Sequence, residues 1–292
     1  MKPSYSFVRT PEQIAELSKP FQVDIFGQEL LNLCWEIDES VYKHLLPPHY
    51  EPVAPVAVAF IGRFGRPRYH HPYNEAAVHI PCQVNGVFGT LCLSMPLCGS
   101  DVGEFAGREF YSFPKRDAKV EFQRIGSRVH GEVTRNGITF FKVSATLTGS
   151  LNDQSAIEYL GPAIREGVDA PVNGDGQCFL LKYDLDADAT ENPNKSFCDL
   201  FQRVRIQREL SKQTFHSREY GQIDELQFEA SEDDPWIELK PVRYLGAAFS
   251  KLETHMSLTK TVYEYAAEEY KDVLPHCYHA WDSDFYGVYH FS

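Results

Sequence analysis

One lysine of this chain stands in a segment that could make its amine nucleophilic. Lys115 follows a largely aromatic run, Phe110–Pro114, and precedes Arg116. A lysine attacks a carbonyl carbon only as the neutral amine, and at the ordinary lysine pKa of about 10.4 roughly one amine in 10³ is neutral at pH 7. Burial among apolar groups or a neighbouring cation lowers such a pKa. The segment therefore suits Schiff-base formation with a ketone or aldehyde, although a lysine taken alone is more often an exposed residue.

Several reactions could follow from such a Schiff base. The iminium withdraws electrons from the adjacent carbon, so loss of carbon dioxide, of a proton or of an aldehyde fragment from that carbon becomes easier. The lysine by itself leaves all three open. Other residues of the site must decide which bond breaks.

The wider context of this lysine resembles a known family. The stretch Gly107–Arg116 (GREFYSFPKR) is similar to the signature of acetoacetate decarboxylases, a Gly-Arg-Glu followed by aromatic-Pro-Lys-Lys. This resemblance implies that Lys115 is the Schiff-base lysine. Tyr73-Asn74-Glu75 looks like the family's Tyr-x-Glu, which implies that Glu75 lies in the active site, where it would move a proton or orient the substrate. Further similar segments, in family order, are Leu45–Pro48, 146–150, Phe179–Lys182 and Val262–Tyr265.

Two positions depart from the family pattern. Gln28-Glu29 stands where the decarboxylases carry an Arg-Glu pair, and Ala59–Ile61 stands where they carry a second glutamate. Gln28 can hydrogen-bond a substrate oxygen but cannot neutralise a carboxylate. The departures favour a larger, more apolar carbonyl substrate, a keto acid or polyketide-like compound, and a lyase reaction of the aldol or dehydration type.

The predicted site follows from these matches. Its catalytic residues are Lys115, Glu75, Gln28 and Arg116, and its apolar walls come from Phe26, Met95 and Phe113. One alternative is a β-keto-acid decarboxylase in which Arg63, Arg66 or Arg116 replaces the missing arginine. Another is a non-catalytic barrel that binds a small molecule.

No metal or other cofactor is expected. Imidazole and carboxylate groups are common metal ligands, so His70-His71 and Glu75 could suggest a site. Adjacent residues on a strand point to opposite faces, however, so the two histidines are not expected to share an ion.

Composition limits the remaining function classes. The chain of 292 residues has a formal net charge of −13, which argues against a nucleic-acid partner. Its seven cysteines are scattered and form no CxxC pair, which indicates reduced thiols and favours the cytoplasm. It has no apolar run of about 18 residues, so no membrane span is expected. The family resemblance implies a homo-oligomer that acts on a small carbonyl compound.

The surrounding elements read mainly as strands. Short helices are expected at Pro11–Lys19 and at Asp38–Leu46, the second stopped by two prolines. Asn85-Gly86 and Asn136-Gly137 each separate two apolar runs, which predicts tight hairpins because both central turn residues need positive φ. Further strands are expected at Val56–Ile61, Cys178–Tyr183, Phe201–Arg208 and Val242–Leu252.

These elements predict an α+β fold, in which a mainly antiparallel sheet closes into a barrel-like core with short flanking helices. Residues 1–267 are expected to form a single domain. Residues 268–292 are rich in Tyr, Trp and Phe. We expect this extension to pack on the domain or at a subunit interface.

Overall fold

The computed structural model describes residues 8, 10–17, 23–68, 71–160, 172–185, 197–257 and 259–277. Strands dominate this part of the chain. They are β1 (Val23–Glu36), β2 (Glu51–Pro52), β3 (Val56–Pro67), β4 (Tyr73–Val84), β5 (Val87–Cys98), β6 (Lys115–Asp117), β7 (Lys119–Ile125), β8 (Arg128–Arg135), β9 (Ile138–Thr146), β10 (Val172–Leu185), β11 (Phe201–Phe228), β12 (Arg243–Met256) and β13 (Lys260–Glu264). The α-helices are α1 (Pro11–Leu17), α2 (Glu39–Leu45), α3 (Asp101–Ala106), α4 (Ile157–Leu160) and α5 (Tyr270–Val273).

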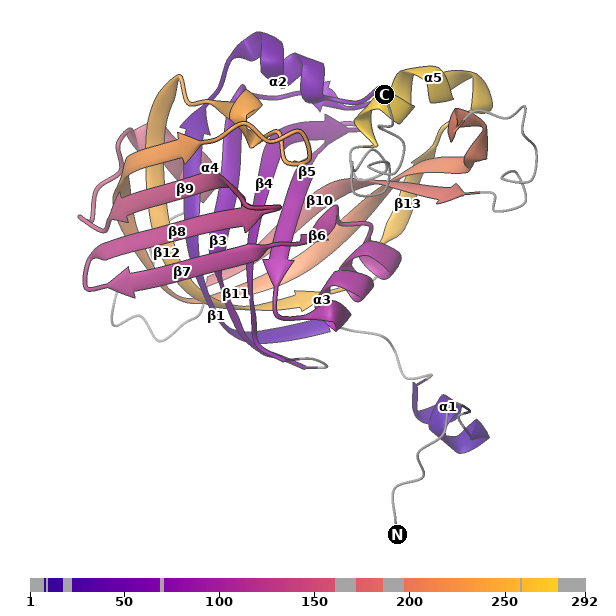
Figure 1. Cartoon of the computed structure of the whole chain (residues 1–292), viewed down its shortest axis with the longest axis horizontal. Helices are drawn as coiled ribbons and strands as arrows, with labels where there is room; N and C mark the ends of the chain where they lie inside the picture. The colour runs from indigo at the N-terminus through magenta and orange to yellow at the C-terminus, as the bar shows by residue number, and fades with distance from the viewer. Residues whose placement is uncertain are drawn as a thin grey trace.

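Seven strands close into a ring. The order is β10-β5-β4-β3-β1-β12-β11, and β10 pairs with β11 as well as with β5, so the last strand returns to the first (Figure 1). Neighbours in the ring are antiparallel except for the short parallel contact between β10 and β5. The predicted α+β fold with a closed, mainly antiparallel sheet is confirmed.

The long strand β11 belongs to two sheets. Its first part pairs with β10 and β12 in the ring, whereas residues Gln222–Phe228 pair with β9, and β8 and β7 follow outward. The main hydrophobic core includes Ile61 from the ring together with Val129 and Phe141 from the second sheet. The ring strands therefore have one face on this core, which leaves the opposite face available for a cavity.

Both Asn-Gly hairpins form where the sequence predicts them. Asn85 and Gly86 have φ of 52° and 71° and join β4 to β5. Asn136 and Gly137 have φ of 52° and 80° and join β8 to β9. Asparagine and glycine tolerate this left-handed region better than other residues, so the two dipeptides set the register of their hairpins.

Both predicted helices are present in the described residues. Helix α2 begins after Asp38, whose carboxylate accepts hydrogen bonds from the backbone N–H groups of Ser40 (2.8 Å) and Val41 (3.2 Å). Helix α1 covers Pro11–Leu17, while Lys19 lies outside the described residues. None of the helices in the described ranges is long and apolar enough to cross a membrane.

The first part of the aromatic extension packs on the ring. Val273, Leu274 and Cys277 are buried in the main core, and the Tyr270 hydroxyl donates to the Gln202 carbonyl oxygen (2.9 Å). Residues 278–292 lie outside the described part of the chain.

Candidate active site

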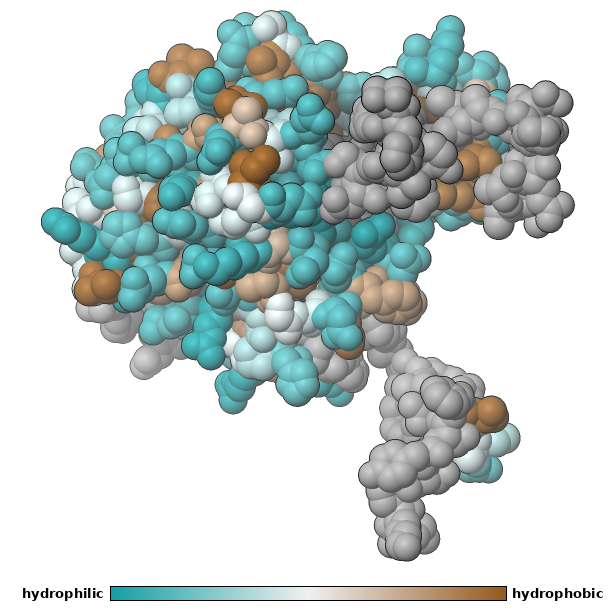
Figure 2. Space-filling model, in the orientation of Figure 1, coloured by the Kyte–Doolittle hydropathy of each residue, from teal (hydrophilic) through white to brown (hydrophobic). Residues whose placement is uncertain are grey.

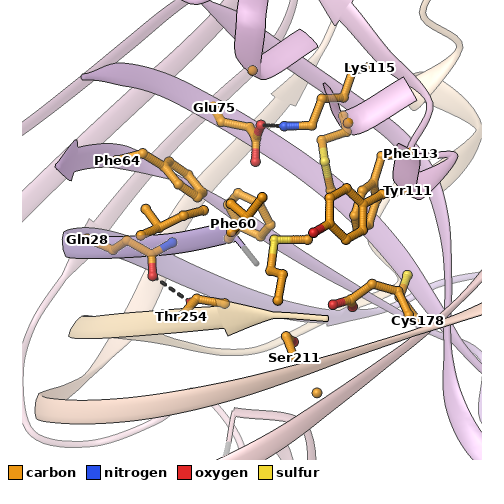
Figure 3. A pocket seen from close by; sticks show the side chains of 18 of the residues that line it. Gln28, Phe60, Phe64, Glu75, Tyr111, Phe113, Lys115, Cys178, Ser211 and Thr254 are labelled. Carbon is orange, nitrogen blue, oxygen red and sulfur yellow. Dashed lines mark hydrogen bonds and ion pairs between the residues drawn. The ribbon is translucent and has the colours of Figure 1, made fainter. Parts of the chain in front are cut away.

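The ring strands enclose a cavity of about 420 Å³ on the face opposite the main core. Alternation along the strands explains its lining, because Val58, Phe60 and Phe64 of β3 face the cavity while Ala59 and Ile61 face the core. The walls are mainly apolar and aromatic (Figure 3), and include Ile25, Leu30, Phe60, Phe64, Tyr73, Met95, Tyr111, Phe113, Phe215, Leu252 and Met256.

The side of the cavity formed by α3 and the turn that follows it is also apolar. Val102, Phe105 and Phe110 line the cavity and at the same time expose 44%, 60% and 45% of their surface. Figure 2 shows hydrophobic atoms on the surface over α3. Exposed apolar side chains therefore border the cavity on this side.

Lys115 and Glu75 form a buried ion pair on the cavity wall. The Lys115 amine donates to Oε2 of Glu75, and 7% and 3% of the two side chains are exposed (Figure 3). The amine also lies 5.5 Å from the centre of the Tyr73 ring. Burial raises the pKa of the Glu75 carboxyl, while the charge and hydrogen bond of Lys115 act in the opposite direction. The carboxylate is thus placed to exchange protons with the amine and with atoms bound to it.

The chain before Lys115 turns sharply to place it on β6. Residues Gly107–Tyr111 form a π-helical turn that follows α3, and Ser112 then adopts the left-handed region with φ of 68°. Strand β6 pairs in parallel with β5, and Lys115 lies beside Met95 in this register. Both side chains consequently line the cavity.

Gly107 leaves the space that the lysine occupies. A Cβ atom at this position would lie 2.4 Å from both Cδ and Cε of Lys115, which is far inside van der Waals contact. The backbone of Gly107 is ordinary right-handed helix, with φ of −62°. The glycine is therefore required by the close approach of Lys115 and not by backbone conformation.

Gln28 lines the cavity as predicted, whereas Phe26 does not. A β-bulge relative to β12 falls between Ile25 and Gln28, around Gly27 with its φ of 62°. The bulge changes which residues face inward, so Ile25 and Gln28 line the cavity and Phe26 instead contacts His255 (ring centres 6.0 Å apart). The prediction of Phe26 as a cavity wall is corrected by this irregularity.

The amide of Gln28 is oriented by a neighbour. Its Oε1 accepts a hydrogen bond from the Thr254 hydroxyl (2.6 Å). This contact leaves the amide NH₂ as the group that can donate to a substrate oxygen.

Arg116 does not line the cavity. It follows Lys115 on β6, and successive strand residues point to opposite faces. Its guanidinium donates to the Asp233 carbonyl oxygen (2.7 Å), and its side chain is buried. The structure thus corrects the placement of Arg116 in the pocket, and its proposed electrostatic effect on the amine stays a prediction.

The other predicted positions support an apolar site. Met95 and Phe113 both line the cavity, as does Phe60 from the segment that stands in place of the family's second glutamate. No arginine is found among the described lining residues. Neither Arg63 nor Arg66 therefore takes the place of the arginine that the decarboxylases carry at the position of Gln28.

Glu209 and His79 are among the titratable residues of the cavity that sequence reasoning missed. Glu209 on β11 is 2% exposed, and burial raises its pKa to about 8. His79 on β4 stacks with Phe60 (ring centres 6.1 Å apart), and burial lowers its pKa to about 4. Both groups are therefore mainly neutral at pH 7. Neither lies in a recognisable motif, and only the ring closure brings Glu209 to the site.

The histidine pair lies only partly within the described residues. His70 lies outside them, and no group of three potential metal ligands occurs within the described ranges.

A family model described as acetoacetate decarboxylase matches residues 8–266, a range that contains Lys115, Glu75 and Gln28. The chain belongs to the acetoacetate decarboxylase family. The resemblance drawn from the motif around Lys115 is thereby confirmed.

The names of the individual relatives point to different activities. CLA biosynthesis isomerase from Lactiplantibacillus plantarum is 32% identical over 257 residues, which cover 85% of each chain. The acetoacetate decarboxylase of Legionella pneumophila superposes with a TM-score of 0.69 at 16% identity, over 84% of this chain and 89% of its own. The enduracididine biosynthesis enzyme MppR, complexed with pyruvate, superposes with a TM-score of 0.65 at 16% identity, over 90% of this chain and 99% of its own. The two solved structures establish a shared fold.

Proposed function

We propose that this protein is an enzyme that forms a Schiff base between Lys115 and a ketone or aldehyde of a largely apolar substrate, and that Glu75 then moves a proton on that substrate. The observation that carries the proposal is the buried Lys115–Glu75 pair on the wall of an apolar cavity. A structural ion pair would have little reason to stand at a cavity, because removing two charges from water is costly.

The pair can perform each proton step of such a reaction. Glu75 accepts a proton from the Lys115 ammonium, and the neutral amine adds to the carbonyl carbon. Glu75 returns the proton to the carbinolamine hydroxyl, which leaves as water, so the iminium forms and Glu75 is again a carboxylate. Glu75 then removes a proton from the adjacent carbon to give an enamine. When a double bond lies next to that carbon, return of the proton to the far end of the conjugated system moves the double bond, and hydrolysis releases an isomer of the substrate and restores the amine.

Isomerisation by proton transfer is therefore the reaction that we favour. The relative at 32% identity is named as an isomerase, which supports this class. Decarboxylation is less well supported, because a substrate carboxylate near Gln28 would gain neutral hydrogen bonds, which are weaker than those from a guanidinium. The aldol or dehydration reactions expected from the sequence start from the same iminium and remain the second candidate.

Trapping with borohydride tests the Schiff base. The protein is incubated with saturated and unsaturated aliphatic ketones and aldehydes, reduced, and mapped by peptide mass. We expect added mass on Lys115, and none in Lys115→Ala, whereas the exposed Lys142 serves as a matched control in Lys142→Ala. Label spread over surface lysines with none on Lys115 would overturn the proposal.

Deuterium and product analysis separate the reactions. Proton transfer incorporates deuterium from D₂O next to the carbonyl and shifts the double bond of an unsaturated ketone. An aldol reaction instead releases a smaller carbonyl fragment, dehydration releases water from a hydroxy compound, and decarboxylation releases carbon dioxide.

Two wider expectations complete the proposal. The six cysteines that the described structure records are all free thiols, in keeping with a cytoplasmic enzyme. We also expect a homo-oligomer, which light scattering of the purified protein would test.

A further inference from the structure

Glu209 is a buried acid that the reaction at Lys115 and Glu75 does not use. It lies on β11 opposite Cys178 of β10, lines the cavity and is 2% exposed. Its Oε1 has no hydrogen-bond partner within the described residues. Buried polar atoms are nearly always paired, so an unpaired one on a cavity wall is a position where a bound molecule can supply the partner.

A second unpaired atom on the neighbouring strand does not join Glu209. The Gln177 Oε1 is buried without a hydrogen-bond partner in the described part of the chain. Gln177 pairs with Leu210 while Cys178 pairs with Glu209, so the side chains of Gln177 and Glu209 point to opposite faces of the sheet.

Ser211 adds a hydroxyl on the same face of β11, and together with Glu209 it forms one polar patch on the cavity wall. It lies two residues after Glu209 on β11 and lines the cavity. Its Oγ packs over Gly176, where a Cβ atom would come within 2.7 Å. In Figure 3, Ser211 and Cys178 lie on the far side of the cavity from the Lys115–Glu75 pair.

The protonation of Glu209 decides what the patch can bind. Burial raises its pKa to about 8, so its neutral acid form dominates at pH 7. Two other titratable groups of the cavity, Tyr111 and Cys178, interact with Glu209. Burial, and to a smaller extent the Glu209 charge, raises the pKa of both groups, so they are also neutral at pH 7. Glu209 therefore offers one O–H donor, and the Ser211 hydroxyl can donate or accept.

We propose that Glu209 and Ser211 bind a hydroxyl group of the substrate while its carbonyl group reacts at Lys115. A hydroxyl can accept from the acid and donate to the Ser211 oxygen, which pairs the unpaired Glu209 atom. A substrate carboxylate would place an anion beside Glu209 with no arginine among the described lining residues. An alkyl group would leave the Glu209 atom unpaired.

The substrate class that follows is a hydroxylated, otherwise apolar carbonyl compound. This inference rests on the proposed function, because it takes Lys115 as the point that holds the carbonyl carbon. A direct binding measurement keeps the two ideas separable.

The probes are a linear aliphatic methyl ketone and its monohydroxy derivatives with the hydroxyl at successive carbons. In the wild-type protein, we expect one derivative to reach half-maximal borohydride trapping at a concentration roughly 10- to 100-fold lower than the parent ketone. Glu209→Leu should abolish that preference and leave trapping of the parent ketone intact. Glu209→Gln, which keeps a donor, should retain part of it, and the exposed Glu225→Leu on the same strand should retain all of it.

A pH series separates hydrogen bonding from packing. The preference should decline in the wild type as pH rises through about 8, where Glu209 loses its proton, and should not decline in Glu209→Gln. A wild-type protein that prefers no hydroxy derivative, or a preference that survives Glu209→Leu, would overturn the inference.

Calorimetric binding of the same probes to Lys115→Ala covers the case in which no trapping occurs. If the preferred hydroxy ketone still binds more tightly than the parent, the hydroxyl site stands although the Schiff base fails. If the two probes bind Lys115→Ala equally tightly, the hydroxyl site is refuted whether or not the Schiff base forms.

Discussion

Gly107→Ala provides a sharp test of how the fold positions the reactive amine. The added Cβ would lie 2.4 Å from Cδ and Cε of Lys115. Carbon atoms pack best at about 3.5 to 4.0 Å, so the lysine chain must move by about 1.1 to 1.6 Å. Gly107 is buried in a helical turn, and the lysine stem is the flexible partner, so we expect the stem and not the backbone to shift.

The expected effect is on chemistry and not on folding. Alanine favours helix over glycine by about 1 kcal/mol, so the variant should fold at least as well unless the displaced lysine opposes it. A misplacement of about 1 Å can cost roughly 10²-fold in rate, which corresponds to about 2.7 kcal/mol of barrier. We therefore expect the rate of borohydride trapping at Lys115 to fall by about two orders of magnitude at an unchanged melting temperature.

A second glycine supplies the control. In Gly131→Ala the Cβ would lie 2.7 Å from Cδ1 of Ile61, in the main core and away from the cavity. This variant should lose about 1 to 3 kcal/mol of stability through overpacking but should trap ketones normally when folded. Wild-type trapping by Gly107→Ala, or an equal loss in both variants at matched stability, would refute the reasoning.

Three further changes have expected outcomes. Glu75→Gln should slow Schiff-base formation, because the amide cannot take the proton of the Lys115 ammonium. Deuterium incorporation next to the carbonyl, followed by NMR, should fall about 10²- to 10⁴-fold for the same reason; unchanged exchange would assign the proton step elsewhere. Gln28→Arg should increase carbon dioxide release from acetoacetate, because a guanidinium can pair with its carboxylate; efficient release by the parent protein would instead restore decarboxylation as the function. For Glu209, burial raises the pKa from 4.5 to about 8, so the native state binds more protons than the unfolded state between these values and stability falls as pH rises through that window. Glu209→Gln should flatten this decline in thermal melts, and identical pH profiles would show that the acid is not held neutral.

Much of the site could be read from the sequence because its residues lie in local motifs. The aromatic flank of Lys115 and the Tyr73–Glu75 motif brought the two members of the ion pair to attention. The Asn-Gly dipeptides marked two hairpins, because few residues accept positive φ. Gln28 and Phe60, in place of charged residues, already indicated an uncharged cavity wall.

The predictions for Arg116 and Phe26 were wrong for one reason. The face of the sheet to which a side chain points depends on how its strand pairs with its neighbours. Arg116 was grouped with Lys115 although neighbouring strand residues diverge. Phe26 was grouped with Gln28, two residues away, but the bulge at Gly27 changes the alternation. A bulge depends on the pairing of β1 with β12, which is more than 200 residues distant in the chain, so sequence spacing could not reveal it.

The sequence alone determined the chemistry available to this protein, because side-chain type and local context are enough to mark a potential Schiff-base lysine and a pocket without the family's arginine and second glutamate. Tertiary structure decided the rest. Closure of the ring brought Glu209 of β11 to the same cavity as Lys115 of β6, and close packing made Gly107 part of the site. Those relations depend on contacts between distant segments, and such contacts exist only once the strands have paired.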